Sequence, residues 1–139
     1  MDQSTWTTRG IDVQHSLNDK FELEFSTKFG RDTLKTCNQF VCLDATHNTN
    51  ILTLLVQNEY SHGVTVALLL CSDATTTTIE RFLSSFKLIC PEVVTFMTDK
   101  DTSEIEAIKK IYPHSRRLLC WWHVERAWKV NIMQLFNII

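Results

Sequence analysis

Apolar side chains gather in three consecutive runs near the middle of the chain, at residues 39–44, 51–57 and 64–71. Runs of this length with few polar interruptions are typical of strands that are covered on both faces of a sheet. A polar turn that ends in Gly63 joins the second run to the third, which predicts an antiparallel hairpin. We therefore expect three neighbouring antiparallel strands in this part of the chain.

After the third run, the spacing of apolar positions changes from that of a strand to that of a helix. Residues 72–90 are predicted to be helical, with Asp73 or Thr75 as the cap and Pro91 as the end. The large apolar side chains of this segment share one helical face: Ile79, Phe82, Leu83, Phe86 and Ile89. Such a face is expected to pack against the sheet.

The next unit repeats the order of strand and helix. Residues 93–97 are apolar and predict a fourth buried strand, which ends at Thr98-Asp99. A capping box then opens a second amphipathic helix, made either by Asp101 with Glu104 or by Ser103 with Glu106. Both residue pairs fit the spacing equally well.

The last predicted unit completes the topology. Pro113 ends the second helix, residues 117–121 predict a fifth strand, and a third helix runs from His123 to the end of the chain. Three antiparallel strands followed by alternating helix and strand form a mixed α/β sheet with helices on its faces. This order is that of the ribonuclease H-like fold.

The N-terminal part gives weaker signals. Residues 1–20 are polar with little periodicity and predict a loosely packed lead-in. Residues 21–25 alternate between apolar and polar side chains, which favours a half-buried or edge strand, and residues 32–37 are compatible with a short helix. We therefore divide the chain into an N-terminal lead-in, residues 1–38, and a ribonuclease H-like domain, residues 39–139.

Composition narrows the class of protein. The length of 139 residues corresponds to one domain, and the formal net charge of −2 provides no overall basic field that would attract nucleic acid. The five cysteines form an odd set in mostly apolar surroundings, which indicates reduced thiols in an intracellular protein. Neither a signal peptide nor an apolar run long enough to span a membrane is visible, so we expect no membrane contact.

Two aspartates stand where buried strands end. Asp44 closes the first apolar run, and Asp99 closes the fourth. In the predicted sheet these strands are central neighbours, so the two side chains would converge at one edge and could hold a metal for chemistry on phosphodiesters. The alternatives are structural, because Asp44 could stabilise its Asn-rich turn and Asp99 could cap the next helix. Asp101 is the alternative second ligand, although it is also a natural helix cap.

Five motifs along the chain resemble those of the Mutator-like element (MULE) transposase domain. They occur in the family's order: residues 43–50 (LDATHNTN), Thr98-Asp99, Ala107-Ile108, Tyr112-Pro113 and residues 119–123 (LCWWH). The resemblance covers residues 40–128 and implies a DDE-type transposase core. Such a core uses two aspartates and a later glutamate to hold two Mg²⁺ or Mn²⁺ ions for DNA strand cleavage and transfer.

The resemblance also assigns roles and partners. Asp44 would be the first catalytic acid and Asp99 the second, each a ligand of the metal. The DNA partner would be the transposon ends, the location would be the nucleus, and no small-molecule cofactor is expected. A homo-oligomer is compatible with such a role.

Two departures from the family pattern affect activity. The family's third acid lies beyond the Cys-x-x-His element, and this chain reaches Ile139 before it, so we expect a core truncated at the C-terminus. The segment after Asn50 is also shorter than in the family. We therefore expect a partial catalytic domain that is inactive as this isolated chain. The alternative is a non-catalytic, domesticated or relic domain that binds DNA or protein, and a third, weaker interpretation uses Glu125 as a stand-in third acid.

The remaining candidate residues surround the last predicted strand and helix. Cys120 and His123 have the spacing of metal ligands, but a zinc site needs four ligands and only one pair is present. This pair either shapes the site or forms half of a metal centre. His47 could contact a phosphate or a metal, although a surface turn is the favoured interpretation. One basic and aromatic cluster suits a nucleic-acid backbone and stacked bases, unless its tryptophans pack inside the protein: Arg116, Arg117, Arg126 and Lys129, with Trp121, Trp122 and Trp128.

Overall fold

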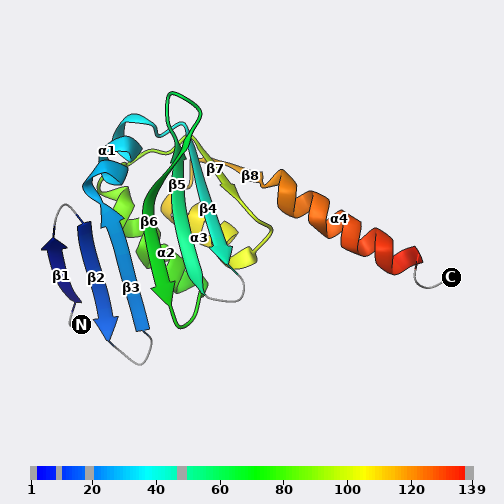
Figure 1. Ribbon diagram of the computed structural model, residues 1–139, viewed down its shortest axis with the longest axis horizontal. Coiled ribbons are helices and arrows are strands. Elements are labelled where there is room, and N and C mark those ends of the chain that lie inside the picture. Colours follow the sequence, from blue (N-terminus) through cyan, green and yellow to red (C-terminus); the bar gives the residue numbers. More distant parts are fainter. Residues whose placement is uncertain (1–2, 9–10, 18–20, 47–49, 137–139) are drawn as a thin grey trace.

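The computed structural model describes residues 3–8, 11–17, 21–46 and 50–136 (Figure 1). The elements follow in the order β1 (Gln3–Thr8), β2 (Ile11–Leu17), β3 (Phe21–Thr27), α1 (Lys28–Thr36), β4 (Phe40–Thr46), β5 (Ile51–Gln57), β6 (Gly63–Cys71), α2 (Thr76–Lys87), β7 (Thr95–Thr98), α3 (Thr102–Ile111), β8 (Arg116–Leu119) and α4 (Trp121–Phe136). His47, one of the predicted contact residues, lies outside the described residues.

The described strands form one eight-stranded mixed sheet in the order β1-β2-β3-β6-β5-β4-β7-β8. Neighbours are antiparallel from β1 as far as β4. The pairs β4–β7 and β7–β8 are parallel, because α2 and α3 provide crossover connections. The predicted ribonuclease H-like sheet, with three antiparallel strands followed by alternating helix and strand, is confirmed.

The N-terminal part contains more strand than its sequence predicts. The loosely packed lead-in expected for residues 1–20 is wrong, because β1 and β2 extend the sheet there. β1 carries mostly polar side chains and lacks the apolar alternation from which a strand is recognised. β2 does show it, since Ile11, Val13 and Leu17 alternate with polar residues, and the prediction of a lead-in missed this signal. The strand predicted for residues 21–25 is present and half-buried, which confirms the first of its two alternatives. It is not an edge strand, since β3 pairs with both β2 and β6. The domain boundary at residue 38 stays a prediction.

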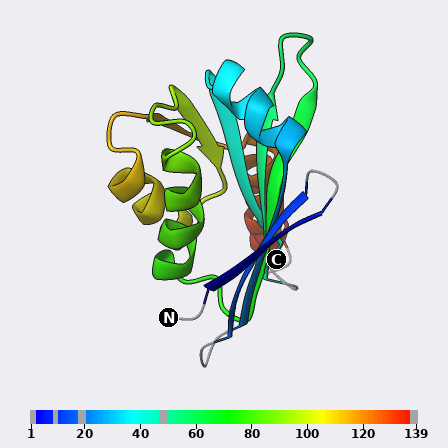
Figure 2. The same cartoon turned by 90° about the vertical axis from the view of Figure 1, so that its left-hand side faces the viewer.

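Helices cover both faces of the sheet. Figure 2 shows α2 and α3 on one side and α1 on the other. The α2 face packs as predicted from its period, with Phe82 and Phe86 buried and in edge-to-face contact at 5.4 Å between ring centroids. The helix α4 instead leaves the sheet and projects away from it (Figure 1).

The helices α2 and α3 begin at predicted N-cap residues, but the capping box predicted for α3 is incomplete. Thr75 caps α2 and Asp101 caps α3, where its side chain accepts hydrogen bonds from the N–H groups of Ser103 and Glu104. The reciprocal half of the predicted capping box is absent, because the Asp101 N–H donates to Asp99 Oδ1 at 2.6 Å. The side chain of Glu104 is thereby free to turn inward.

All five cysteines are free, as expected of reduced thiols, and Cys71 and Cys90 are buried. Burial raises the pKa of the Cys42 thiol to about 12, so this group stays protonated at neutral pH. In the described part of the chain, none of the helices combines the length and apolar character needed to cross a membrane.

Candidate functional site

The two predicted acids lie side by side at the ends of neighbouring parallel strands. In the β4–β7 pair, the last Cα partners are Cys42 and Met97. Asp44 lies two residues after Cys42, and Asp99 lies two residues after Met97, directly beyond the end of β7, so the two aspartates stand at the same level of neighbouring strands. Neighbouring strands are about 4.8 Å apart, which makes the two aspartates close neighbours at this edge of the sheet.

The surroundings of the two aspartates differ. The Asp44 side chain is 45% exposed, and its Oδ1 lies 4.0 Å from Nε2 of His123. Asp99 is buried, and its Oδ1 accepts the N–H of Asp101. The Asp101 contact fixes the Asp99 carboxylate as an Asx turn would, while Asp44 keeps an open side toward solvent.

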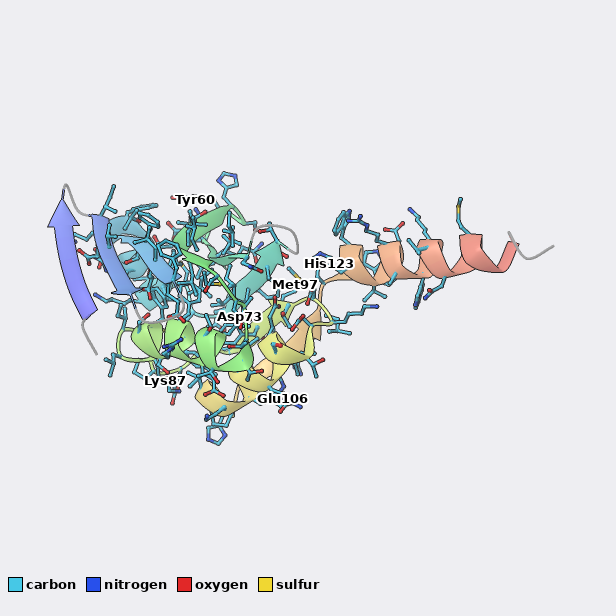
Figure 3. All side chains as sticks on the ribbon, turned by 90° about the horizontal axis from the view of Figure 1, so that it is seen from below. Tyr60, Asp73, Lys87, Met97, Glu106 and His123 are labelled. Carbon is cyan, nitrogen blue, oxygen red and sulfur yellow. The ribbon has the colours of Figure 1, made fainter. Side chains whose placement is uncertain are left out.

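The predicted Cys-x-x-His element belongs to the same edge of the sheet. β8 pairs with β7 up to Leu119, and the N–H of Cys120 donates to the carbonyl of Thr98 at 2.8 Å. Cys120 therefore continues the row of strand-end residues that begins with Asp44 and Asp99. The chain then enters α4, whose first turn brings His123 back against Asp44, and Figure 3 shows His123 where α4 leaves the sheet.

Glu104 is a member of this region that the sequence did not reveal. Its side chain is 1% exposed, and its Oε2 accepts a hydrogen bond from the Thr98 hydroxyl. Its Oε1 has no hydrogen-bond partner among the described residues. Burial raises the pKa of this carboxyl to about 8, and the nearby negative charges of Asp99, Asp101 and Asp44 act in the same direction. Glu104 therefore holds a proton at neutral pH and adds no charge to the site.

The donor set at these strand ends fits one hydrated divalent ion better than two. Mg²⁺ keeps several waters and is commonly held by one or two carboxylates, which Asp44 and Asp99 supply. A two-ion clamp needs further carboxylate oxygens. Within the described ranges, no three side chains of the types His, Cys, Asp and Glu come close enough to hold a metal. Two carboxylates at most could contribute to a site for one hydrated Mg²⁺ or Mn²⁺ ion here, and the described residues do not supply the ligands of a second ion.

A cavity opens next to the buried aspartate. It has a volume of about 500 Å³ and lies between the β7–α3 loop and α4. Its wall contains Asp99 and His123 together with two basic side chains, Lys100 from the loop and Arg126 from α4. A second cavity of about 280 Å³ continues along α4 past Cys120. The cavity therefore combines two basic side chains, Lys100 and Arg126, with the carboxylates of Asp99 and Asp101.

The other predicted site residues lie on the outside of β8 and α4. Arg116 and Arg117 are exposed on β8, and the Arg126 guanidinium carbon lies 5.3 Å from the ring centroid of Trp122. Glu125 pairs with Lys129 at 2.7 Å on the helix surface, so its carboxylate is engaged away from the two aspartates. The tryptophans of this cluster do not form a packed interior, since all three are more than half exposed: Trp121, Trp122 and Trp128.

The fold and its strand-end aspartates define a ribonuclease H-like α/β domain. A family model described as "Zinc finger SWIM domain-containing protein 1/3, RNaseH-like domain" matches residues 8–118, and the chain belongs to that family. The matched range covers both Asp44 and Asp99 and ends within β8, before Cys120 and His123. A comparison with curated proteins finds no match.

Proposed function

We propose that this chain is a catalytic core of the Mutator-like DDE transposase type, which binds DNA around one divalent ion and does not cut DNA with its two strand-end aspartates alone. The observation that carries this proposal is the alignment of Asp44 and Asp99 on adjacent parallel strands. The family match to a ribonuclease H-like domain supports a role on nucleic acid. A nuclear location is part of the proposal, because it follows from that role.

In this proposal, separate residues bind the metal ion, position a ligand and neutralise phosphate. Asp44 and Asp99 would hold the Mg²⁺ or Mn²⁺ ion, whose chemistry is to polarise a phosphodiester oxygen. His123 packs against the exposed side of Asp44 and restricts how that carboxylate turns. Lys100 and Arg126 line the adjoining cavity and would neutralise phosphates beside the ion.

DNA binding needs a local basic surface, because the whole chain carries a formal net charge of −2. We place this surface at the end of the molecule formed by β8 and α4, which carries the predicted contact residues Arg116, Arg117, Arg126 and Lys129, the last of them paired with Glu125. Transposon ends would be the natural DNA partner of a complete core of this type. Phosphate contacts of this kind give affinity that falls with salt.

A non-catalytic binding module is the second candidate. It is favoured by the lack of any three-ligand metal group in the described part of the chain, and by the position of Glu125, which pairs with Lys129. The first candidate binds DNA, and the second binds DNA or protein. They differ in whether the strand-end aspartates make that binding depend on a divalent ion.

The proposal predicts that Mn²⁺ tightens DNA binding through Asp44. Fluorescence anisotropy with a labelled duplex should show an affinity about tenfold higher with Mn²⁺ than with EDTA, which corresponds to about 1.4 kcal/mol. Asp44→Asn should abolish this gain. Without metal, the same variant should bind slightly better than the unmodified chain, because one negative charge near the phosphates is gone.

The matched control is Glu59→Gln, which removes a negative charge from the exposed turn between β5 and β6 and should leave the Mn²⁺ gain intact. Equal affinity with Mn²⁺ and EDTA would favour the non-catalytic module. The same reactions, run on a gel, should contain no nicked DNA. Nicking that survives Asp44→Asn would contradict every role that we assign to the aspartate pair.

A further inference from the structure

The helix α4 exposes large apolar side chains along most of its length. One side of the helix faces the sheet, where His123, Ala127 and Asn131 line both cavities. These side chains are small or polar. Of the large apolar side chains, Val124 and Trp128 border the smaller cavity. Most of the others remain about half exposed or more, although the apolar face of a helix usually packs on its own domain: Trp121, Trp122, Trp128, Val130, Ile132 and Met133.

Four of these residues form a continuous stripe, which we call the tryptophan stripe: Trp121, Val124, Trp128 and Ile132. Their spacing of three, four and four residues places them on one face of a helix with 3.6 residues per turn. The rings of Trp121 and Trp128 are in edge-to-face contact at 5.9 Å between centroids. Trp121, Trp128 and Ile132 nevertheless remain 64%, 57% and 51% exposed.

Contiguous exposed apolar surface of this kind marks a site of interaction. The stripe has the spacing with which helices pack on one another, because each turn of the helix contributes one apolar side chain to the same face. Leu119, which is half exposed at the end of β8, borders the same cavity as Trp128 and widens the patch. The surface is therefore suited to a helix from another molecule.

We propose that the tryptophan stripe is the contact surface for a second copy of this chain, with the two α4 helices packed antiparallel about a two-fold axis. Two half-exposed tryptophans with an isoleucine and a leucine offer on the order of 500 Å² in each copy. The pair would bury about 1,000 Å², which is the lower limit for a specific interface. The area predicts a weak, reversible dimer.

The charges beside the stripe are compatible with this arrangement. Glu125 and Lys129 lie on the same flank of α4, one turn apart, and pair with each other within one copy. In an antiparallel two-fold pair, the same flanks of the two helices meet, so each copy presents both signs of charge to the other. The two copies therefore attract at this flank instead of repelling each other.

Sedimentation equilibrium of the 139-residue chain tests the proposal. Between about 1 and 200 µM, the apparent mass should rise from that of a monomer to that of a dimer, with a dissociation constant on the order of 10 µM. Trp128→Ser should weaken association by about 30-fold or more, because it removes the central side chain of the stripe. Ile132→Lys should have a similar effect by placing a charge in the contact.

Trp122→Ser is the matched control, because Trp122 is also an exposed tryptophan of α4, at 56%, but lies on another face beneath Arg126. It should change the dissociation constant by less than about twofold. Loss of association in this control equal to that in Trp128→Ser would overturn the assignment of the stripe. A chain that stays monomeric at about 200 µM would also overturn it. The same holds if Trp128→Ser lowers the affinity for DNA at concentrations at which the unmodified chain is already a monomer.

Discussion

Replacing Glu104 with glutamine is expected to stabilise the protein at pH 8 by about 2–4 kcal/mol and to have little effect at pH 4.5. The carboxyl group of Glu104 is buried between α3 and β7, and burial raises its pKa from 4.5 to about 8. Between these two pH values the folded chain keeps a proton that the unfolded chain releases. The free energy of unfolding must therefore fall as pH rises, by up to about 1.4 kcal/mol per pH unit.

Glutamine removes this pH dependence without changing the shape of the side chain. Its carbonyl can accept the hydrogen bond of the Thr98 hydroxyl, and its amide occupies the place of Oε1, which has no partner among the described residues. Some decline with pH should remain in the variant. Burial also raises the pKa of Glu24 to about 7, against the opposing effect of its hydrogen bond with Ser85.

Urea unfolding at pH 4.5, 6.5 and 8 measures the effect. The control is Glu106→Gln on the same helix, where the carboxylate is about half exposed and pairs with Lys109. This variant should follow the profile of the unmodified chain. If Glu104→Gln and Glu106→Gln gave the same pH profile, the carboxyl of Glu104 could not be the group that holds the proton.

Gly30→Ala is expected to destabilise the protein by about 2–3 kcal/mol, although alanine normally stabilises a helix by about 1 kcal/mol over glycine. Gly30 lies in α1, and a Cβ built there would stand 2.7 Å from the carbonyl oxygen of Thr65 and 2.8 Å from Cα of Val66. Both are backbone atoms of β6. They cannot rotate away as the end of a side chain could, so either the helix or the strand must shift.

Gly63→Ala provides the control within the same chain. A Cβ at Gly63 meets only the Leu55 side chain, at 3.9 Å, which is an ordinary contact. The free energy of unfolding of this variant should stay within about 0.5 kcal/mol of the original. Thermal or urea unfolding of the two variants makes the comparison, and a Gly30→Ala variant as stable as Gly63→Ala would show that α1 does not pack this closely on β6.

The central sheet could be predicted from the sequence because buried strands consist mainly of apolar residues. In β4, β5 and β7 the residues of one face are buried and those of the other are half-buried, so these strands appear as short apolar runs. β1 is mostly polar and β2 has only three apolar positions, because pairing with a neighbour also stabilises such strands. Local pattern identifies buried strands and misses polar ones.

The site could be predicted only in part, for a related reason. Asp44 and Asp99 were visible because each ends an apolar run, and the topology then makes them neighbours. The contact between His123 and Asp44 depends on how α4 leaves β8, which residue spacing does not specify. Glu104 has the spacing of a capping residue, and only the hydrogen bond from the Asp101 N–H to Asp99 explains why it turns inward.

The central claim is that Asp44 and Asp99 together hold one divalent ion, and Mn²⁺-induced broadening of backbone NMR signals tests it most directly. At low Mn²⁺, the amides around the ends of β4 and β7 should broaden together and before others, because both lie beside the ion. Asp44→Asn should remove the broadening at both strand ends. Broadening at only one of these ends, or first at an exposed acid such as Asp32 on α1, would contradict the claim.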